Sequence, residues 1–336
     1  MKALVCTTPG QFDYINTEMT APAEGETLLK IERIGICGTD LHAFEGTQPY
    51  FNYPRILGHE LAATIVETKA VGFTAGDKVT IIPYMHCGNC IACNCGKNNC
   101  CVNMRVFGVH IDGGMREFVT VPNHALLKSE GLSLDELALI EPLAIGAHAV
   151  KRAAVANGEF VLVIGAGPIG LGIAQFARIA GAHVIVVDVI DDRLQFCTTH
   201  VGVKHTINPL SQDVMESLKQ ITSNNMPTVV MDATGNLKAI NNAFAYLAHG
   251  GRYVLVGLQK EHISFSHPEF HKREATLMSS RNANVSDFEH VMESIKNGLV
   301  QPANYITHKV AFDEVATQFE TWLHPNSKVV KAMIVF

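Results

Sequence analysis

A glycine-rich segment between two apolar runs limits the folds that this chain can adopt. The segment reads FVLVIGAGPIGLGIAQFARIAGAHVIVVD and places Gly165, Gly167 and Gly170 in GxGxxG spacing. The spacing alone is weak support, because glycines in an apolar stretch are often only packing residues. Here it follows a β-branched run and opens a stretch with helical spacing, after which a second apolar run ends at Asp188. This order of strand, turn, helix and strand predicts a doubly wound parallel sheet that binds a dinucleotide.

The residues around this turn indicate which dinucleotide it binds. Pro168 and Ile169 lie between the glycines, where the backbone approaches a pyrophosphate held at the positive end of the following helix. Asp188 is placed to accept hydrogen bonds from the adenosine ribose hydroxyls, and its charge disfavours a 2′-phosphate. Arg193 lies five residues further on, where it either flanks the adenine or is an ordinary solvated helix arginine. The sequence therefore predicts NAD rather than NADP as the cofactor.

The rest of the chain indicates a second domain. The 336 residues are enough for about two domains with full cores. Short apolar runs broken by Gly, Pro and Asp fill the chain up to about residue 125, whereas strands and helices alternate from residue 160. We therefore expect an α/β protein with a mostly β domain at 1–147, an NAD-binding domain at 148–280, and a segment at 281–336 that returns to the first domain.

Composition argues against several other classes of protein. The formal net charge is −6 and no Lys/Arg run is present, which disfavours nucleic-acid binding. The most apolar stretch is interrupted by Arg178 and Asp188, so it indicates buried strands and a helix rather than a membrane span. The N-terminus has too short an apolar run for a signal peptide. We expect a cytoplasmic protein with a small-molecule substrate, whose clustered cysteines are metal ligands rather than disulfides.

A short loop carries most of the cysteine in this chain. The stretch CGNCIACNCGKNNCC holds six of the nine cysteines. Those that follow the pattern C-x2-C-x2-C-x7-C are Cys87, Cys90, Cys93 and Cys101. Four thiolates can close a tetrahedral zinc shell with no position open to water, which is a structural site. Cys95 and Cys100 remain, and either could replace a neighbour as a ligand, while the alternative without metal is a set of free thiols.

A second group of metal-ligand residue types lies earlier in the chain. Cys37 occurs in GICGTDLH, and His59 and Glu60 follow in the tripeptide GHE. A thiolate, an imidazole and a carboxylate leave a fourth position on zinc for water or substrate, as in a catalytic site. The ordinary alternative is structural, since a lone cysteine is usually a small buried hydrophobic residue.

Seven motifs occur in order along nearly the whole chain. They are GICGTDLH, GHE, the four-cysteine loop, DGGMREF, EPLAIGAHAV, GAGPIGLG and DATG. With them the sequence resembles the zinc-containing medium-chain alcohol dehydrogenases, in the polyol branch with the sorbitol and threonine dehydrogenases. The resemblance implies a GroES-like catalytic domain followed by a Rossmann domain. It also implies an NAD-dependent dehydrogenase with one catalytic and one structural zinc ion per subunit, assembled as a tetramer or, alternatively, a dimer.

The resemblance also assigns the residues of the catalytic zinc site. It maps the ligands onto Cys37, His59 and Glu60. It places Glu141, in EPLA, where its carboxylate can bind zinc directly or exchange with water. The liver-type alcohol dehydrogenases have a second cysteine where Glu141 stands. The third protein ligand is therefore left open between Glu60 and Glu141.

Two further groups of residues have roles by resemblance. Thr39 would pass the alcohol proton, through the nicotinamide ribose, to His42 near the surface, although the two can also be a loop-capping hydroxyl and a surface histidine. The reference pKa of histidine, about 6.5, suits proton exchange at neutral pH. The segments VGL and SSR match backbone that holds the nicotinamide half of the cofactor in the family. The residues concerned are Val256, Gly257, Leu258, Ser280 and Arg281.

The segments around these motifs indicate the substrate. GTDLHAFEGTQPYFNYPRILGHE, GVHIDGG and FSHPEFHKREATLMSSRNA resemble the bacterial sugar-acid dehydrogenases more than the sorbitol enzymes. The expected substrate is a hexonate such as L-galactonate, oxidised at a secondary alcohol. Arg281 is the first candidate to bind its carboxylate, and Lys272 and Arg273 are weaker ones. The aromatic residues that could wall the pocket, or merely pack, are Tyr50, Phe51 and Tyr53.

Several alternatives stay open. The enzyme could oxidise a polyol such as sorbitol, or L-threonine, with the same residues. A zinc-free quinone or enoyl reductase can use the same fold, although Cys37, His59 and Glu60 together argue against it. A non-catalytic NAD-binding protein would need neither the metal ligands nor the proton relay.

Overall fold

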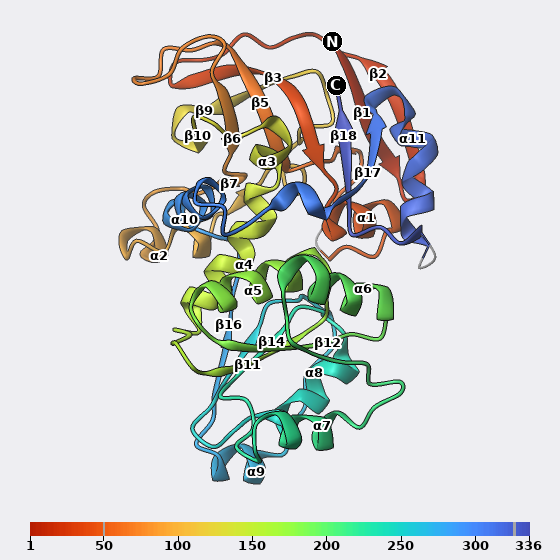
Figure 1. The fold of residues 1–336 in the computed structure, drawn as a ribbon. Coiled ribbons are helices and arrows are strands. Elements are labelled where there is room, and N and C mark those ends of the chain that lie inside the picture. The colour runs from red at the N-terminus through yellow and green to blue at the C-terminus, as the bar shows by residue number, and fades with distance from the viewer. Residues whose placement is uncertain (50, 325–326) are drawn as a thin grey trace. The chain divides into compact units, whose positions relative to one another are not determined.

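The computed structural model describes residues 1–49, 51–324 and 327–336 (Figure 1). They form two compact units, one of Met1–Pro142 with Asn284–Phe336 and one of Leu143–Ala283. The limits near residues 147 and 280 come from the change in sequence pattern and stay predictions. Within the described residues, no helix is both long enough and apolar enough to cross a membrane.

The first unit is built mainly on antiparallel sheet. Its larger sheet has seven strands, with β9 (Phe118–Pro122) beside β3 (Glu26–Gly35) off the main path. The main path runs through β10 (Leu126–Lys128), β6 (Lys78–Ile81), β5 (Glu60–Glu67), β3, β18 (Lys331–Val335) and β17 (Ile306–Ala311). A smaller sheet runs through β2 (Gln11–Asn16), β1 (Lys2–Thr8) and β4 (Arg55–Ile56). A separate pair is formed by β7 (Tyr84–Met85) and β8 (Arg105–Val106).

Two long-range strand pairings bring distant parts of the chain together. The C-terminal strand β18, blue in Figure 1, pairs antiparallel with β3, and Met333 lies opposite Gly35. On its other side β3 pairs with β5, and Gly35 lies opposite Glu60. The ends of three strands therefore meet around Gly35, where Lys331 at the start of β18 comes close to Glu60.

Two helices of this unit begin directly after residues that occupy their N-cap positions. The helix α1 (Gly38–Glu45) follows Cys37, and α3 (Leu134–Ala138) follows Ser133. The Ser133 hydroxyl accepts the N–H of Glu136, while the Glu136 carboxylate accepts the N–H of Ser133. This reciprocal pair is a capping box. The other helices that lie within this unit are α2 (Ile91–Asn94), α10 (Val285–Lys296) and α11 (Val315–Gln318).

A proline separates α3 from α4 (Ile140–Arg152). Pro142 has no N–H to donate to the carbonyl of Ala138, so the first helix cannot simply continue. Proline is tolerated in the first turn of a helix, where N–H groups have no partner in the helix. The break places Glu141 in the first turn of α4.

The second unit is a doubly wound parallel sheet, which confirms the predicted fold class. Its strands, in spatial order, are β13 (His205–Ile207), β12 (His183–Val187), β11 (Phe160–Ile164), β14 (Val229–Asp232), β15 (Arg252–Leu255) and β16 (Thr276–Ser279). Its helices are α5 (Pro168–Ile179), α6 (Asp191–Phe196), α7 (Val214–Ile221), α8 (Leu237–Ala243) and α9 (His267–Lys272). The strand order reverses at β11, and ligands of such sheets bind beyond the carboxyl ends of the strands at that point.

Candidate functional site

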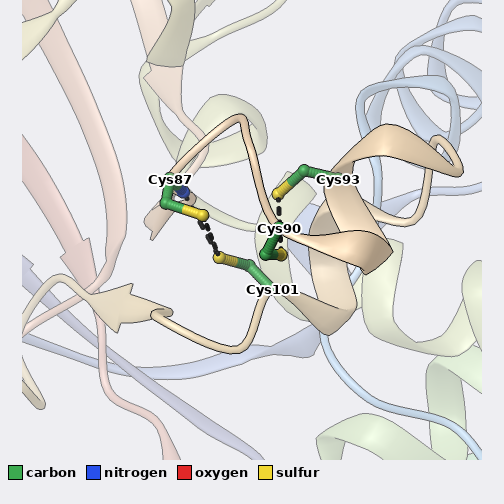
Figure 2. Close-up of side chains that lie close together, drawn as sticks. All are labelled: Cys87, Cys90, Cys93 and Cys101. Atoms are coloured by element: carbon green, nitrogen blue, oxygen red, sulfur yellow. Dashed lines mark hydrogen bonds between the residues drawn. The ribbon is translucent and has the colours of Figure 1, made fainter.

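The cysteine loop of the first unit brings four sulfur atoms to one point (Figure 2). The Sγ atoms of Cys87, Cys90, Cys93 and Cys101 all lie within 4.8 Å of one another. The pairs Cys90–Cys93 and Cys101–Cys87 are each 3.5 Å apart between sulfurs. Among the described residues the group includes Cys101 and not Cys100, and both Cys95 and Cys100 are exposed. Four converging sulfurs fit a closed tetrahedral zinc site.

Backbone N–H groups help to organise this cysteine group. The N–H groups of Cys93 and Val102 donate toward Cys90 and lower the pKa of its thiol to about 6. The Cys87 N–H donates to the Cys101 sulfur at 3.2 Å. Because the thiolate is the form that binds metal, donors aimed at sulfur favour a metal-binding state.

A second donor group lies around the end of β3 and the start of β5. One donor atom from each of Cys37, His59 and Glu60 lies within 4.8 Å of the others. His59 and Glu60 are buried, and His59 Nδ1 has no hydrogen-bond partner among the described residues. A buried polar nitrogen without a partner is costly unless something else binds it. A mixed sulfur, nitrogen and oxygen set with an unsatisfied imidazole fits an open zinc site.

A glycine makes room for the carboxylate of this group. A Cβ atom added to Gly35 would lie 2.1 Å from Glu60 Oε2. Any other residue at position 35 would therefore displace the Glu60 side chain or the strand that carries it.

Asp40 supports two of these donors and was not singled out from the sequence. Its Oδ2 accepts the Cys37 N–H at 2.9 Å, and its Oδ1 accepts the Gly58 N–H at 3.1 Å. The same Oδ1 lies 3.8 Å from His59 Nδ1. Burial alone would lower the pKa of the His59 imidazole, but the charges of Asp40 and Cys37 raise it well above its usual value. The spacing Cys-x-x-Asp at a helix start, which resembles a capping box, could have identified Asp40.

Lys331 was also missed, and it binds the carboxylate of the same group. Its Nζ lies 2.7 Å from both oxygens of Glu60 and donates to Ile36 O at 3.0 Å. Both side chains of the ion pair are almost fully buried, at 2% and 0% exposure. Burial opposes the charge of Lys331, yet Glu60 and Cys37 raise its pKa, so the ammonium persists. A lysine inside the apolar run VVKAMIVF was the available signal.

Glu141 lies beside this group and is held by a tyrosine. The Tyr84 hydroxyl donates to Glu141 Oε1. Burial raises the pKa of Glu141 to about 7, against the opposing charge of His59 and with the help of the Glu60 charge. Among the described residues, Glu141 is not one of the three mutually close donors. The structure therefore brings Cys37, His59 and Glu60 together and places Glu141 next to them.

The two residues of the predicted proton relay lie on α1. Thr39 and His42 are three positions apart, so they share one face of the helix. Thr39 is half-buried, whereas His42 is exposed and its Nδ1 lies 3.3 Å from Glu45 Oε2 and 3.2 Å from Thr47 Oγ1. The two side chains thus extend from a partly buried position to an exposed one, as the predicted proton path to solvent requires.

The glycine-rich turn of the second unit has the close approaches that its sequence requires. A Cβ atom on Gly170 would lie 1.8 Å from Gly165 O, and Gly165 has φ of +97°. Gly167 is the N-cap of α5, and Pro168 occupies its first turn. Because the first N–H groups of a helix have no partner within it, the start of α5 can face an anion, as in dinucleotide-binding turns.

Asp188 closes the same turn from the end of β12. Its Oδ2 accepts the Ala166 N–H at 2.6 Å, and its Oδ1 accepts the Ile190 N–H at 2.9 Å. Arg193 Nη1 lies 3.9 Å from Asp188 Oδ2. Asp188 thus orders the glycine-rich turn, and each oxygen has further capacity to accept a ribose hydroxyl.

The remaining predicted cofactor residues follow two neighbouring strands. Val256 and Gly257 come directly after β15, and their N–H groups both donate to Asp232 O at 2.9 Å. Leu258 is 72% exposed. Ser280 and Arg281 come directly after β16, and the buried Ser280 Oγ has no partner among the described residues. Because the sheet is parallel, these residues share its carboxyl edge with the glycine-rich turn.

The weaker substrate candidates lie elsewhere. Lys272 and Arg273 precede β16 and so belong to the amino edge of the sheet. Arg273 Nη1 lies 2.6 Å from Glu269 Oε2, and its Nε donates to Leu247 O. This placement gives no support to a role in substrate binding, because ligands of parallel sheets bind at the carboxyl edge.

The aromatic candidates are packing residues as far as they are described. Tyr50 lies outside the described residues. The rings of Phe51 and Tyr53 are 4.9 Å apart, and the Tyr53 hydroxyl donates to Ala43 O. Both pack against the hydrophobic core of the first unit.

Two family models and a curated relative match this chain. The model described as zinc-binding dehydrogenase matches residues 168–297, and that described as alcohol dehydrogenase GroES-like domain matches residues 23–131. L-Galactonate-5-dehydrogenase of Escherichia coli K12 is 41% identical over 338 residues, which cover 100% of this chain and 99% of that protein. The chain therefore belongs to the zinc-type alcohol dehydrogenase family, as its motifs predicted.

Two more similar proteins agree with this assignment. Sorbitol dehydrogenase of Halalkalibacterium halodurans is 30% identical, with 94% of each chain covered. The solved structure of RspB from Escherichia coli CFT073 is described as a short chain alcohol dehydrogenase complexed with NADH. It is 31% identical, with a TM-score of 0.93, and the match covers 100% of this chain and 99% of that one. The chain is an oxidoreductase that acts on CH–OH groups, which confirms the predicted enzyme class and the GroES-like domain.

Proposed function

We propose that this enzyme uses NAD to oxidise a secondary alcohol of a hexonate such as L-galactonate to a keto acid. The observation that carries the proposal is the 41% identity to L-galactonate-5-dehydrogenase, with both chains covered almost completely. NAD is supported by Asp188, whose buried carboxylate at the end of β12 would repel a 2′-phosphate. The solved relative with NADH supports the same cofactor.

Two zinc ions per subunit complete the proposed enzyme. Cys87, Cys90, Cys93 and Cys101 hold the structural ion. Cys37, His59 and Glu60 hold the catalytic ion, with Glu141 beside it. When bound, the catalytic zinc lowers the pKa of the substrate hydroxyl, and NAD accepts the hydride. The support for two sites is that each set of donor atoms lies within 4.8 Å.

The chain's own residues position the reactants and move the proton. Asp40 holds the backbone at Cys37 and Gly58, so that the thiolate and imidazole are fixed before substrate binds. Lys331 orients Glu60 by donating to both of its carboxylate oxygens. Thr39 takes up the alcohol proton and His42 releases it to solvent, because His42 is exposed on the same helix face.

The residues at the carboxyl edge of the parallel sheet bind the cofactor. Gly165, Gly167, Pro168, Ile169 and Gly170 hold the pyrophosphate at the start of α5. Asp188 and Arg193 take the adenosine end, and the segments after β15 and β16 take the nicotinamide half. The members of those two segments are Val256, Gly257, Leu258, Ser280 and Arg281.

A substrate panel tests the proposed reaction directly. NADH formation is measured with L-galactonate, other hexonates, sorbitol, xylitol and L-threonine. L-Galactonate is expected to have the highest kcat/KM. If sorbitol, xylitol or L-threonine exceeds every hexonate by about tenfold or more, the hexonate assignment is wrong. Sorbitol oxidation is the second candidate, since a sorbitol dehydrogenase is similar over 94% of the chain.

Arg281 offers a sharper test of the acid group. Arg281→Ala should lower kcat/KM for a hexonate by about 30-fold or more, and far less for neutral sorbitol, because only the hexonate loses a charged contact. Lys272→Ala is the matched control, since Lys272 lies at the opposite edge of the sheet and should change neither value. Equal losses for both substrates would assign Arg281 to the cofactor alone.

The proposed assembly is a tetramer, with a dimer as the alternative, and the proposed compartment is the cytoplasm. The assembly rests on the family resemblance, whereas the clustered cysteines, as metal ligands rather than disulfides, suit a reducing compartment. The mass of the native particle in solution tests the assembly.

A further inference from the structure

A buried tyrosine faces a carboxylate next to the proposed catalytic metal. We propose that Tyr84 is a positioning residue that keeps the Glu141 carboxylate beside the metal rather than on it, so that the fourth coordination position stays open for the substrate hydroxyl. This inference rests on the proposed function, because it concerns the same metal site. It adds to that function a residue for which the sequence motifs offered no role.

The possible metal ligands of this site are not all equally close together. Cys37, His59 and Glu60 form the group within 4.8 Å, and Glu141 stands outside it among the described residues. The Tyr84 hydroxyl donates to Oε1 of Glu141, and both residues are buried, at 6% and 4% exposure. The one hydrogen bond found to the Glu141 carboxylate among the described residues therefore comes from Tyr84.

Tyr84 is held in place from several sides. It belongs to β7 and pairs with Val106 of β8. Its ring packs edge-on against Phe288 of α10, with 6.3 Å between ring centroids. Burial and the nearby Glu141 carboxylate raise the pKa of the phenol well above its usual value, so it remains a donor. Glu141 is held at the start of α4. A fixed donor can thus hold a carboxylate whose backbone is also fixed.

The two carboxylates of the site have different hydrogen-bond partners. Glu60 receives an ammonium group on both of its oxygens, each at 2.7 Å. Glu141 receives a neutral phenol on one oxygen. Tyr84→Phe removes the hydrogen bond to Glu141 and leaves no buried cation without a partner. The position of the Glu141 carboxylate therefore depends on one neutral group that can be substituted. Without Tyr84, the carboxylate would lose this hydrogen bond and could bind a metal held by Cys37, His59 and Glu60 instead.

The ordinary alternative is that Tyr84 only packs and finds a partner because buried phenols usually do. Tyr253 provides a matched control for that alternative. It is fully buried in the second unit, and its hydroxyl donates to Ile240 O at 3.1 Å. Tyr253→Phe removes a buried phenol hydrogen bond without touching a carboxylate or a metal donor.

The experiment compares Tyr84→Phe and Tyr253→Phe in holoenzyme whose catalytic zinc has been replaced by Co²⁺. In Tyr84→Phe, Glu141 is expected to take the fourth position on the metal, so the visible d–d absorption bands should shift because a carboxylate oxygen replaces the solvent oxygen there. Substrate must then displace an internal competitor, so KM for the alcohol should rise about tenfold or more while kcat changes less than about twofold. Tyr253→Phe should change neither the spectrum nor KM.

A double mutant shows whether Tyr84 acts through Glu141. Adding Tyr84→Phe to Glu141→Gln should have almost no further effect on the spectrum or on KM, because the group that Tyr84 holds has lost its charge. The inference is overturned if Tyr84→Phe matches Tyr253→Phe in spectrum and KM, or if its effect persists in the Glu141→Gln background. If the wild-type protein binds no more Co²⁺ than a Cys37→Ser variant, the proposed catalytic site is wrong. This inference then fails with it.

Discussion

The two donor groups of the first unit are built in opposite ways. The cysteine group comes from one loop of fifteen residues, and three of its four cysteines are at least partly exposed. The group of Cys37, His59 and Glu60 comes from the ends of several elements, and its supporting residue Lys331 is 271 positions away from Glu60. The first group needs little of the fold beyond its loop, whereas the second exists only once three strands have paired.

Because of this difference, we expect mutations in the two groups to affect different properties of the protein. A loop with little apolar content takes its order from the metal, so its loss should remain local. The second group is already braced by Asp40 and Lys331, so loss of a donor should cost catalysis rather than fold. Four substitutions test this expectation.

The largest effect is expected for Cys37→Ser. Removing the thiolate from the open site should lower kcat by about 1000-fold or more, because metal activation of the alcohol contributes several kcal/mol. The circular dichroism spectrum and the zinc of the cysteine group should be unchanged. Retention of a tenth of the activity would show that Cys37 is not a ligand of the catalytic metal.

The next largest effect is expected for Lys331→Met. The change leaves the buried Glu60 charge without its ammonium partner, which should lower the free energy of unfolding by about 3–5 kcal/mol. Urea denaturation measures the loss. Lys309→Met is the control, because Lys309 pairs with Asp135 nearer the surface, with 49% of its side chain exposed. Its loss should be about 1 kcal/mol or less. Equal losses in the free energy of unfolding would mean that the buried Glu60–Lys331 pair contributes no more to stability than a surface ion pair.

A smaller effect on stability is expected for Cys90→Ser. The cysteine group should lose its zinc, yet the free energy of unfolding should fall by only about 1–3 kcal/mol, because the disorder stays within the loop. Zinc content by elemental analysis and thermal unfolding are the measurements. Cys95→Ser is the matched control, since Cys95 is an exposed cysteine of the same loop outside the group. Active, fully loaded wild-type protein with a single zinc ion would reject the two-site proposal.

The smallest effect is expected for Asp135, which lies outside both donor groups. Its interaction with Lys309 and Arg33 shows how much a partly exposed charge contributes to stability. Burial would raise the pKa of Asp135, but Lys309 and Arg33 lower it below its usual value of 3.8. A carboxyl group with a lowered pKa in the folded state stabilises the fold above pH 3.8 and loses this contribution as pH falls through the lower value. Asp135→Asn should therefore cost about 1 kcal/mol at pH 7 and nothing at the lowest pH. A loss that does not depend on pH would assign Asp135 a packing role.

The sequence alone carried the features that depend on neighbours along the chain. The GxGxxG turn, the strand end at Asp188, the capping box at Ser133 and the four-cysteine spacing are local patterns. Each is set by backbone geometry or metal geometry over a few residues, so each could be predicted. The order of the motifs was also enough to identify the family, and with it the fold class and the reaction class.

Tertiary structure decided what surrounds the second donor group. The pairing of β18 with β3 brings Lys331 to Glu60, and the pairing of β7 with β8 helps to present Tyr84 to Glu141 across 57 positions. Asp40 binds the N–H of Gly58 as well as that of its neighbour Cys37. None of these contacts has a fixed spacing in sequence, because strand register and burial select the partner of each charge only after the chain has folded. Lys331 and Tyr84 therefore have roles that depend on the partners that the folded chain brings to them.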